Sequence, residues 1–204
     1  MKIVLLATDA QWEEIRLSVN AGDEWERAID INNFFKNDTT DLYINLQEDA
    51  FANDYSSLVK PVLINSVLHT LKEMNAAQNV FRINGWNGFL SRNTWEITGS
   101  VNTIVKDFFS GIAKEYTIVA DEPGFIAARI IATIINEAYF ALGEKLSTRE
   151  EIDIAMKLGT NYPYGPFEWC NKIGIKNIYG LLQKLSIKDT SYLPAPLLKQ
   201  EATS

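Results

Sequence analysis

The chain has 204 residues, of which 47% are hydrophobic and 22% charged, and its formal net charge is -7. This size and apolar content allow one core or two small cores to be buried, which excludes wholesale disorder. The acidic balance, without any cluster of Lys and Arg, excludes nucleic acid as an expected partner because phosphate binding requires clustered cations.

The first half of the chain alternates short apolar runs with helical patterns. This alternation predicts an α/β domain with a largely parallel sheet. Ser100 is the predicted cap of the last helix in this half. The predicted strands are residues 2–7, 41–46, 61–65, 80–83, 95–98 and 116–119, and the predicted helices are residues 10–20, 67–74 and 101–113.

After Asp121 the apolar residues recur every three or four positions, which is the period of an amphipathic helix. Ser147 and Thr148 stand shortly before Glu150 and Glu151, and this spacing predicts a capping box at the start of a helix. The predicted helices are residues 125–142, 149–157 and 175–185, with a turn-rich loop at 161–169 and an extended tail at 192–204.

Three local features of this half carry structural predictions. Gly159 is expected to end the second helix. Asn136 and Glu137 lie in an apolar helix and are expected to need partners, because an unpaired buried polar group is costly. Gly165 begins a tight bend that leaves Phe167 free to enter the core.

The longest apolar stretch, residues 125–142, is interrupted by Arg129, Asn136 and Glu137. A charge near the middle of a bilayer costs about 2.5–3.5 kcal/mol on insertion scales, so this stretch predicts a buried helix and no membrane span. The opening apolar run is too short for a signal peptide. We therefore expect a cytoplasmic protein without a membrane partner.

The sequence contains a single cysteine, Cys170, and a single histidine, His69. One thiol cannot form an internal disulfide, and the pair cannot supply a Cys- or His-rich metal site. No metal site is predicted.

Several motifs of the second half occur together and in order: Asp-Glu-Pro-Gly-Phe-Ile at 121–126 with Arg129, Asn-Glu-Ala at 136–138, and the segments 151–159, 162–168 and 192–198. This half resembles the C-terminal domain of the 3-hydroxyacyl-CoA dehydrogenases. The resemblance implies an α/β fold with a shortened, Rossmann-like, mainly parallel sheet domain at 1–119, followed by an all-helical C-terminal domain at 120–204. It also implies a homodimer formed through the helical domain.

The resemblance extends, more weakly, to the positions of the family's catalytic residues. The family has a serine after one strand, a histidine in the next loop, a glutamate on the following strand, and an asparagine on the first C-terminal helix. Glu96 stands at the glutamate position, whereas Asn84 stands at the histidine position and Ala128 at the asparagine position. The serine position holds Val67, or Ser66 if the register shifts by one residue.

These replacements matter for the family reaction, in which a base takes a proton from a 3-hydroxyl group while hydride passes to NAD. Histidine suits this role because its pKa lies near the operating pH, whereas the amide of Asn84 does not titrate there. The side chain of Ala128 cannot form a hydrogen bond, and Glu96 has lost the histidine that it would orient. Trp86 and Asn87, in the same loop as Asn84, are predicted contacts in the cleft.

The cofactor turn also departs from the family pattern. A dinucleotide fingerprint needs glycines for a tight turn, for close approach to the pyrophosphate and for helix–strand packing. After the first strand this chain has Ala7, Asp9 and Trp12 at those positions. Asp9 adds a negative charge where the pyrophosphate would lie, and it is the expected N-cap of the first helix. NAD is therefore implied by the resemblance only, and no cofactor is predicted.

Three functional hypotheses remain. The first is a relative without dehydrogenase activity that binds an acyl-CoA-like molecule or a partner. The second is an active 3-hydroxyacyl-CoA oxidoreductase with a rebuilt site, in which Glu96, His69 or Ser66 carries the proton. The third is a dimerising structural or assembly subunit.

Overall fold

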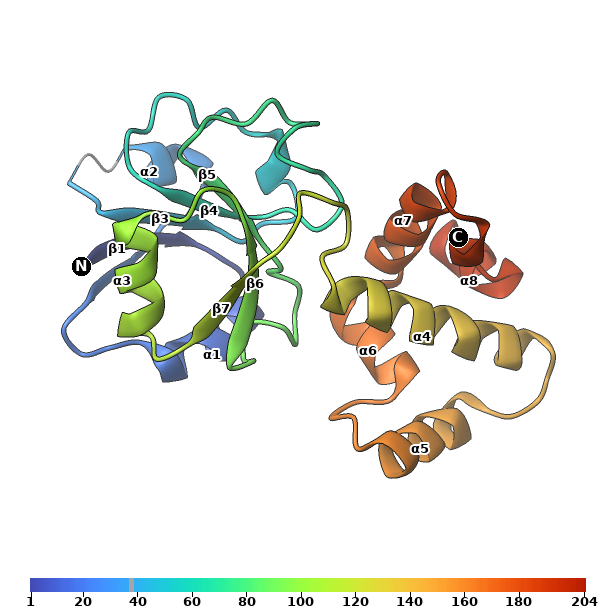
Figure 1. Ribbon diagram of the computed structural model, residues 1–204. Coiled ribbons are helices and arrows are strands. Elements are labelled where there is room, and N and C mark those ends of the chain that lie inside the picture. The colour runs from blue at the N-terminus through green and yellow to red at the C-terminus, as the bar shows by residue number, and fades with distance from the viewer. Residues whose placement is uncertain (37–38) are drawn as a thin grey trace. The chain divides into compact units, whose positions relative to one another are not determined.

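The computed structural model of the protein describes residues 1–36 and 39–204. The chain forms two compact units, Met1–Phe125 and Ile126–Ser204 (Figure 1). The sequence places the boundary earlier, between residues 119 and 120. The intervening turn belongs to the first unit, where the backbone N–H of Gly124 donates to the carbonyl of Val67 at 2.7 Å.

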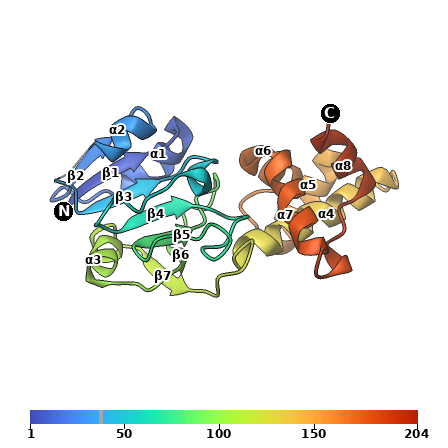
Figure 2. The ribbon, with the colours of Figure 1, turned by 90° about the horizontal axis from the view of Figure 1, so that it is seen from above.

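The first unit is built on a seven-stranded sheet within the described residues, in the order β2-β1-β3-β4-β5-β6-β7 (Figure 2). All neighbouring strands are parallel except β5 and β6, which are antiparallel. This confirms the mainly parallel Rossmann-like sheet. The strands are β1 (Lys2–Leu6), β2 (Glu24–Arg27), β3 (Leu42–Asn45), β4 (Val62–Asn65), β5 (Val80–Ile83), β6 (Thr94–Thr98) and β7 (Glu115–Ile118).

Alternate side chains of the strands enter two separate cores. The core on one face packs against α1 (Asp9–Ile15) and α3 (Thr103–Gly111). The core on the other face packs against α2 (Ile31–Phe35) and the loops near it. The central strands β1, β3, β4 and β5 are therefore buried on both faces, which explains why they appear in the sequence as continuous apolar runs.

Each of the six predicted strands is present, but several helix predictions for this unit are wrong. Residues 67–74 form turns and no helix. The helix α3 begins after Asn102, whose side chain accepts from the backbone N–H of Val105, so Ser100 is not its cap. The edge strand β2 and the short helix α2 were missed, because β2 is polar and half-exposed and so has no apolar run.

Two connections of this sheet lack the α-helix that usually joins parallel strands. Residues 46–61, between β3 and β4, contain only the 3₁₀ turn η2 (Ala50–Ala52). Residues 66–79, between β4 and β5, contain only turns. Both segments are fully described. The shortening predicted for this domain therefore lies in its crossovers and not in its central strands.

The second unit is all-helical outside short turns, as predicted. Its helices are α4 (Ala127–Gly143), α5 (Arg149–Thr160), α6 (Pro166–Ile173), α7 (Ile175–Ser186) and α8 (Pro196–Ala202), with the 3₁₀ turn η3 (Thr190–Tyr192) before α8. The helices α6 and α8 correct two predictions, a loop at 161–169 and an extended tail at 192–204. Both helices begin with proline at their first turn, a helix-start position that also occurs in loops.

Smaller predictions for this unit had mixed outcomes. The capping box of Thr148 with Glu151 is present. Gly159 does not end α5, which continues to Thr160 and stops at Asn161 in the left-handed conformation, with a φ of 56°. Phe167 is buried, as expected from the bend at Gly165.

Candidate functional site

The turn after β1 is closed by the chain's own side chains. Gln11 is 5% exposed, and its amide nitrogen donates to the carbonyls of Leu46 at 2.7 Å and Gly85 at 2.9 Å. Its amide oxygen accepts from the backbone N–H of Thr8 at 3.0 Å. One side chain thus joins the ends of β1, β3 and β5. In open α/β sheets the ligand crevice lies at the carboxyl ends of the strands, where the strand order reverses.

The same turn corrects the prediction for Asp9. Thr8 is the N-cap of α1 and forms a capping box with Gln11, so Asp9 is the first helical residue and not the cap. Its exposed carboxylate accepts from Arg27 at the end of β2, at 2.8 Å. The guanidinium of Arg27 also lies 5.6 Å from the centre of the Trp12 ring. Asp9 and Trp12 therefore interact with Arg27, and the turn lacks the small residues that a pyrophosphate needs.

A second amide extends this closure to β4. The side chain of Asn65 donates to the carbonyl of Leu46 at 3.2 Å and accepts from the backbone N–H of Gly85 at 3.0 Å. A Cβ atom at Gly85 would lie 2.8 Å from the Cβ of Asn65, closer than real contacts allow. Gly85 is thus required by the close approach of Asn65. Neutral amides thus connect the carboxyl ends of β3, β4 and β5.

The loop after β5 is held against α1 by Glu14. Its carboxylate accepts from the backbone N–H groups of Gly88 at 2.6 Å, Leu90 at 3.2 Å and Ser91 at 3.4 Å. Gln11 and Glu14 lie three residues apart on one face of α1, so a single helix fixes both ends of this loop. Sequence reasoning missed both residues, because a polar helix face near a glycine-rich loop has no distinctive pattern.

Asn84, Trp86 and Asn87 all lie in this loop. Asn84 is 7% exposed, and its amide oxygen accepts from the backbone N–H of Trp86 at 3.3 Å. The amide nitrogen of Asn84 and the amide oxygen of Asn87 are buried without a hydrogen-bond partner in the described part of the chain. Trp86 is 5% exposed. An unsatisfied buried polar atom costs about 1–3 kcal/mol, so two in one loop are unusual.

Glu96 lies on β6, next to this loop. The antiparallel register sets Arg82 opposite Thr98 and Ile83 opposite Ile97, and Asn84 and Glu96 are the next positions along it. Opposite residues of an antiparallel pair share a face of the sheet. The register thus brings the predicted histidine and glutamate positions together. Ala128 lies in the second unit, at the start of α4, and is fully buried.

Ser66 and Val67 follow β4 directly, and neither side chain is exposed to solvent. The hydroxyl of Ser66 donates to the carbonyl of His69 at 2.8 Å, and Val67 is 3% exposed. The ring of His69 stacks on Phe51, with 3.9 Å between ring centres. Residues 67–69 form a bend, so His69 does not lie at the start of the helix predicted for residues 67–74.

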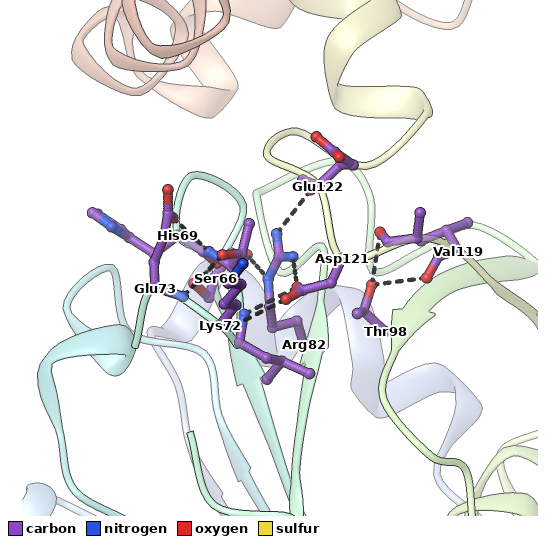
Figure 3. A network of polar contacts seen from close by, with 12 residues as sticks. Ser66, His69, Lys72, Glu73, Arg82, Thr98, Val119, Asp121 and Glu122 are labelled. Carbon is purple, nitrogen blue, oxygen red and sulfur yellow. Dashed lines mark hydrogen bonds and ion pairs between the residues drawn. The ribbon is translucent and has the colours of Figure 1, made fainter. Parts of the chain in front are cut away.

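The most extensive polar network centres on Arg82, a fully buried residue of β5 (Figure 3). Its guanidinium forms an ion pair with Asp121 at 2.5 Å and donates to the carbonyls of Ser66, Val67 and Glu122. It also lies 4.7 Å from the centre of the Phe125 ring. Arg82 thereby joins the turn after β4 to the segment after β7.

Asp121 completes the Arg82 network. Its carboxylate accepts from the backbone N–H groups of Leu71 at 3.0 Å and Lys72 at 3.1 Å. Burial by itself raises the pKa of Asp121, but the hydrogen bonds from Leu71, Lys72 and Arg82 outweigh it and hold the pKa below its usual value. Burial lowers the pKa of Arg82, and Asp121 opposes that shift. Sequence reasoning missed Arg82, although a charged residue within the apolar run of β5 is a signal that could have found it.

Comparisons with known proteins divide the chain in the same way. The family model described as "3-hydroxyacyl-CoA dehydrogenase, C-terminal domain" matches residues 124–203. The 3-hydroxyadipyl-CoA dehydrogenase of Escherichia coli (strain K12) is 43% identical over 86 residues, 41% of this chain and 18% of that protein. The 3-hydroxybutyryl-CoA dehydrogenase of Bradyrhizobium diazoefficiens is 39% identical over 95 residues, 46% of this chain and 32% of that protein. The chain thus spans under two thirds of either relative.

Solved structures extend the likeness to the first unit. The crystal structure of (S)-3-hydroxybutyryl-CoA dehydrogenase from Ralstonia eutropha matches 99% of this chain and 93% of that chain, with a TM-score of 0.71 and 18% identity. At that identity the match shows the fold alone. The crystal structure of 3-hydroxybutyryl-CoA dehydrogenase from Escherichia coli K12 matches 69% of this chain and 31% of that chain, with a TM-score of 0.57 and 31% identity.

This chain is 3-hydroxyacyl-CoA dehydrogenase-like, and the likeness to the family model lies in residues 124–203.

The motifs that this 3-hydroxyacyl-CoA dehydrogenase-like protein shares with its relatives have structural roles in the helical unit. Asn136, on α4, is 1% exposed, donates to the carbonyl of Leu193 at 2.9 Å and accepts from the backbone N–H of Ala195 at 2.8 Å. The partner predicted for buried Asn136 is thus present. Its neighbour Glu137 is exposed and needs none, which corrects the prediction for that residue.

A buried carboxylate connects α5 to α6. Asp153 accepts from the backbone N–H groups of Phe167 at 2.8 Å and Glu168 at 3.2 Å, and so caps α6. Its side chain lies so close to Gly165 that any Cβ atom there would overlap it. The φ of Gly165 is -73°, which any residue can adopt. Gly165 is therefore required by close packing and not by its backbone angle.

Arg149 links several helices of the same unit. It forms an ion pair with Glu201 of α8 at 2.5 Å and lies over the rings of Tyr139 and Phe167, at 5.4 and 4.9 Å. The hydroxyl of Tyr139 donates to Glu201 at 3.0 Å. Burial raises the pKa of the nearby Cys170 thiol, so Cys170 remains protonated and unreactive at neutral pH.

Within residues 1–36 and 39–204, no three His, Cys, Asp or Glu residues are grouped so that they could hold a metal ion. None of the helices in the same ranges is both long and apolar enough to cross a membrane.

Proposed function

We propose that this protein has given up NAD binding and dehydrogenase catalysis and acts by binding an acyl-CoA-like molecule. The observation that carries the proposal is the closure of the β1 turn by Gln11, which bonds to the ends of β3 and β5. A dinucleotide bound in the usual mode would have to displace this buried amide. It would also lie beside the carboxylate of Asp9. A cytoplasmic location belongs to this proposal.

The proton-transfer site supports the same conclusion. Asn84 takes the position of the family's histidine beside Glu96, and an amide cannot act as a general base. General acid–base catalysis contributes about 10²–10⁴-fold to a rate, so its loss leaves a very weak dehydrogenase. Residues 124–203 match the C-terminal domain of a family named for acyl-CoA chemistry, which supports an acyl-CoA-like ligand.

A ligand role is favoured by two buried polar atoms in the loop after β5 that lack a hydrogen-bond partner among the described residues. The amide nitrogen of Asn84 is a donor and the amide oxygen of Asn87 is an acceptor. A ligand with a carbonyl or hydroxyl group would satisfy one or both. An acyl-CoA-like molecule offers such groups on its acyl chain.

Isothermal titration calorimetry with NADH and, separately, with acetoacetyl-CoA tests this proposal. We expect heat with acetoacetyl-CoA and none with NADH, and we expect Asn84→Leu to weaken acetoacetyl-CoA binding. An active 3-hydroxybutyryl-CoA dehydrogenase serves as the positive control for both titrants.

Two results would contradict the proposal in different ways. Turnover followed by NADH absorbance, and abolished in Glu96→Gln, would support an active oxidoreductase with a rebuilt site. The same assay on Ser66→Ala and on His69→Gln would identify the proton carrier. No heat with either titrant would leave only a protein–protein role.

A second role, homodimer formation through the helical unit, is favoured by apolar side chains on α5. Ile154 and Leu158 are 54% and 84% exposed and lie four residues apart, on one face of the helix. We expect light scattering to give a dimer that Leu158→Glu dissociates. Ile187→Glu, at an isolated residue that is 83% exposed, is the matched control and should leave the dimer intact. A monomeric wild type would end this proposal.

A further inference from the structure

A pocket of about 460 Å³ opens on the face of the first unit's sheet opposite α1 and α3. Ile64 of β4 and Val80 of β5 form its floor, and both are almost fully buried. Phe51, Tyr55 and Met74 line it from the two loops that connect β3 to β4 and β4 to β5. The whole pocket therefore belongs to one compact unit.

The pocket lies where the shortened crossovers leave the sheet uncovered by a helix. Residues 46–61 and 66–79 carry the chain between parallel strands with one 3₁₀ turn and no α-helix. A helix in either place would pack its apolar face on Ile64 and Val80. The loops instead surround a hollow whose volume falls in the range of small-molecule sites, about 300–1,000 Å³.

The lining combines a rigid aromatic wall with one negative charge. The hydroxyl of Tyr55 donates to the carbonyl of Ala50 at 2.8 Å and accepts from Asn45 at 2.9 Å, so its ring is fixed. Burial raises the pKa of Tyr55, which keeps its phenol neutral. The carboxylate of Asp54 accepts from the backbone N–H of Ser56 at 2.9 Å, and this bond lowers the pKa of Asp54.

Charge around the pocket favours a cation over an anion. The loop formed by residues 46–61 contains three acidic residues, Glu48, Asp49 and Asp54, but only one lysine, Lys60. The whole chain has a net charge of -7. An anionic molecule such as a nucleotide would therefore be repelled here, whereas an ammonium group would be attracted to Asp54.

We propose that this pocket binds a small aromatic amine, with the ring between the partly exposed side chains of Phe51 and Met74 and the ammonium group at Asp54. This site is separate from the β1 turn and from Asn84, so it does not depend on the proposed function. One lining residue is linked to the Arg82 network. Met74 accepts a weak hydrogen bond from the hydroxyl of Ser66 at 3.7 Å, and the carbonyl of Ser66 accepts from Arg82.

Nuclear magnetic resonance of protein labelled at the methionine methyl groups tests the proposal with three indoles. Tryptamine is the cationic probe, 3-methylindole the neutral one and indole-3-propionate the anionic one. The chain has three methionines, of which Met74 lines the pocket, whereas Met1 and Met156 do not and serve as internal controls. We expect tryptamine to shift the Met74 signal alone and to bind about two- to five-fold more tightly than 3-methylindole. Indole-3-propionate should bind most weakly.

Variants locate the binding. Asp54→Asn should reduce the affinity for tryptamine to that for 3-methylindole and leave 3-methylindole unchanged. Asp107→Asn, on an exposed position of α3 across the sheet, is the matched control and should change neither. Ala52→Trp should fill the pocket and abolish binding of both probes, with circular dichroism to confirm folding. If that variant does not fold, Asp54→Asn still decides the question.

The proposal is overturned if no probe shifts Met74 up to about 10 mM, which corresponds to negligible affinity. It is also overturned if tryptamine and indole-3-propionate bind equally, or if Met1 and Met156 shift together with Met74. Each result leaves the NADH and acetoacetyl-CoA titrations unaffected.

Discussion

Two regions of the chain differ in what the residues at family-like positions do. They are the helical unit and the carboxyl ends of strands β1, β3 and β5. In the helical unit, residues of the shared motifs hold helices together, as Asn136 does with Leu193 and Ala195. At the strand ends, Gln11 closes the turn after β1 by bonding to the carbonyls of Leu46 and Gly85, and the family's functional residues are proposed to be replaced.

This difference shows that a family-like residue can be retained for the fold or for the chemistry. A motif residue that packs or caps is retained as long as the fold is retained, because its loss costs stability directly. A residue needed only for chemistry can change once its role is absent, because the stability of the fold does not depend on it. Sequence similarity to an enzyme family thus indicates fold more safely than activity.

The largest effect is expected at Arg82, where the first unit depends on a buried charge. Arg82→Met removes the ion-pair partner of Asp121 and one donor from each of three carbonyls, and breaking a buried pair typically costs about 3–5 kcal/mol. Denaturant unfolding followed by far-UV circular dichroism measures the change. Arg92→Met, at an exposed position, should stay within about 0.5 kcal/mol of wild type. Equal effects of the two substitutions would remove the structural role assigned to Arg82.

In the helical unit, Gly165→Ala should cost about 3 kcal/mol, because its Cβ would overlap the Asp153 side chain. Gly159→Ala is the matched control, since a Cβ there meets no atom within 4 Å and Gly159 lies inside α5. It should stabilise the protein by about 0.5–1 kcal/mol. Thermal unfolding of both variants checks the prediction, and a tolerated Gly165→Ala would contradict it.

Asn136→Ala should destabilise the helical unit by about 2 kcal/mol, because the Leu193 carbonyl and the Ala195 N–H both lose their partner. Glu137→Ala changes the adjacent exposed residue and should be nearly neutral. Urea unfolding of the two variants gives the comparison. A neutral Asn136→Ala would mean that this shared motif has no structural role.

The β1 turn provides a similar contrast within the first unit. Gln11→Ala removes hydrogen bonds to the carbonyls of Leu46 and Gly85 and should cost about 2 kcal/mol. Asp9→Ala removes an ion pair whose carboxylate is 92% exposed, and should cost less than about 0.5 kcal/mol. If Asp9→Ala proved the more damaging substitution, the closure of the turn would have to be assigned to the ion pair.

The smallest effect concerns pH. The pKa of Asp121 is lower in the folded protein than its ordinary value of 3.8. Its charged form therefore adds stability that is fully present above pH 3.8 and is lost as the pH falls through the lower, folded pKa. The difference in unfolding free energy between wild type and Asp121→Asn should be constant above about pH 5 and shrink below pH 3.8. A difference that grew in acid would contradict this assignment.

The sequence by itself determined the two-part organisation, the six apolar strands and the family of the helical half. These follow from local properties, since continuous apolar runs predict buried parallel strands and motifs at fixed spacing identify a domain. It also predicted replacements of the family's functional residues at Asn84, Ala128 and the β1 turn, and these stay predictions.

Only the tertiary structure decided how those replacements are accommodated. Gln11 and Leu46 are 35 residues apart, and Arg82 and Asp121 are 39 apart, so no local pattern could pair them. The turns at 67–74 and the pocket over Ile64 and Val80 likewise depend on which crossovers cover the sheet. Hydrogen bonds and packing between distant segments are set by the fold, and a sequence pattern reports only its neighbours along the chain.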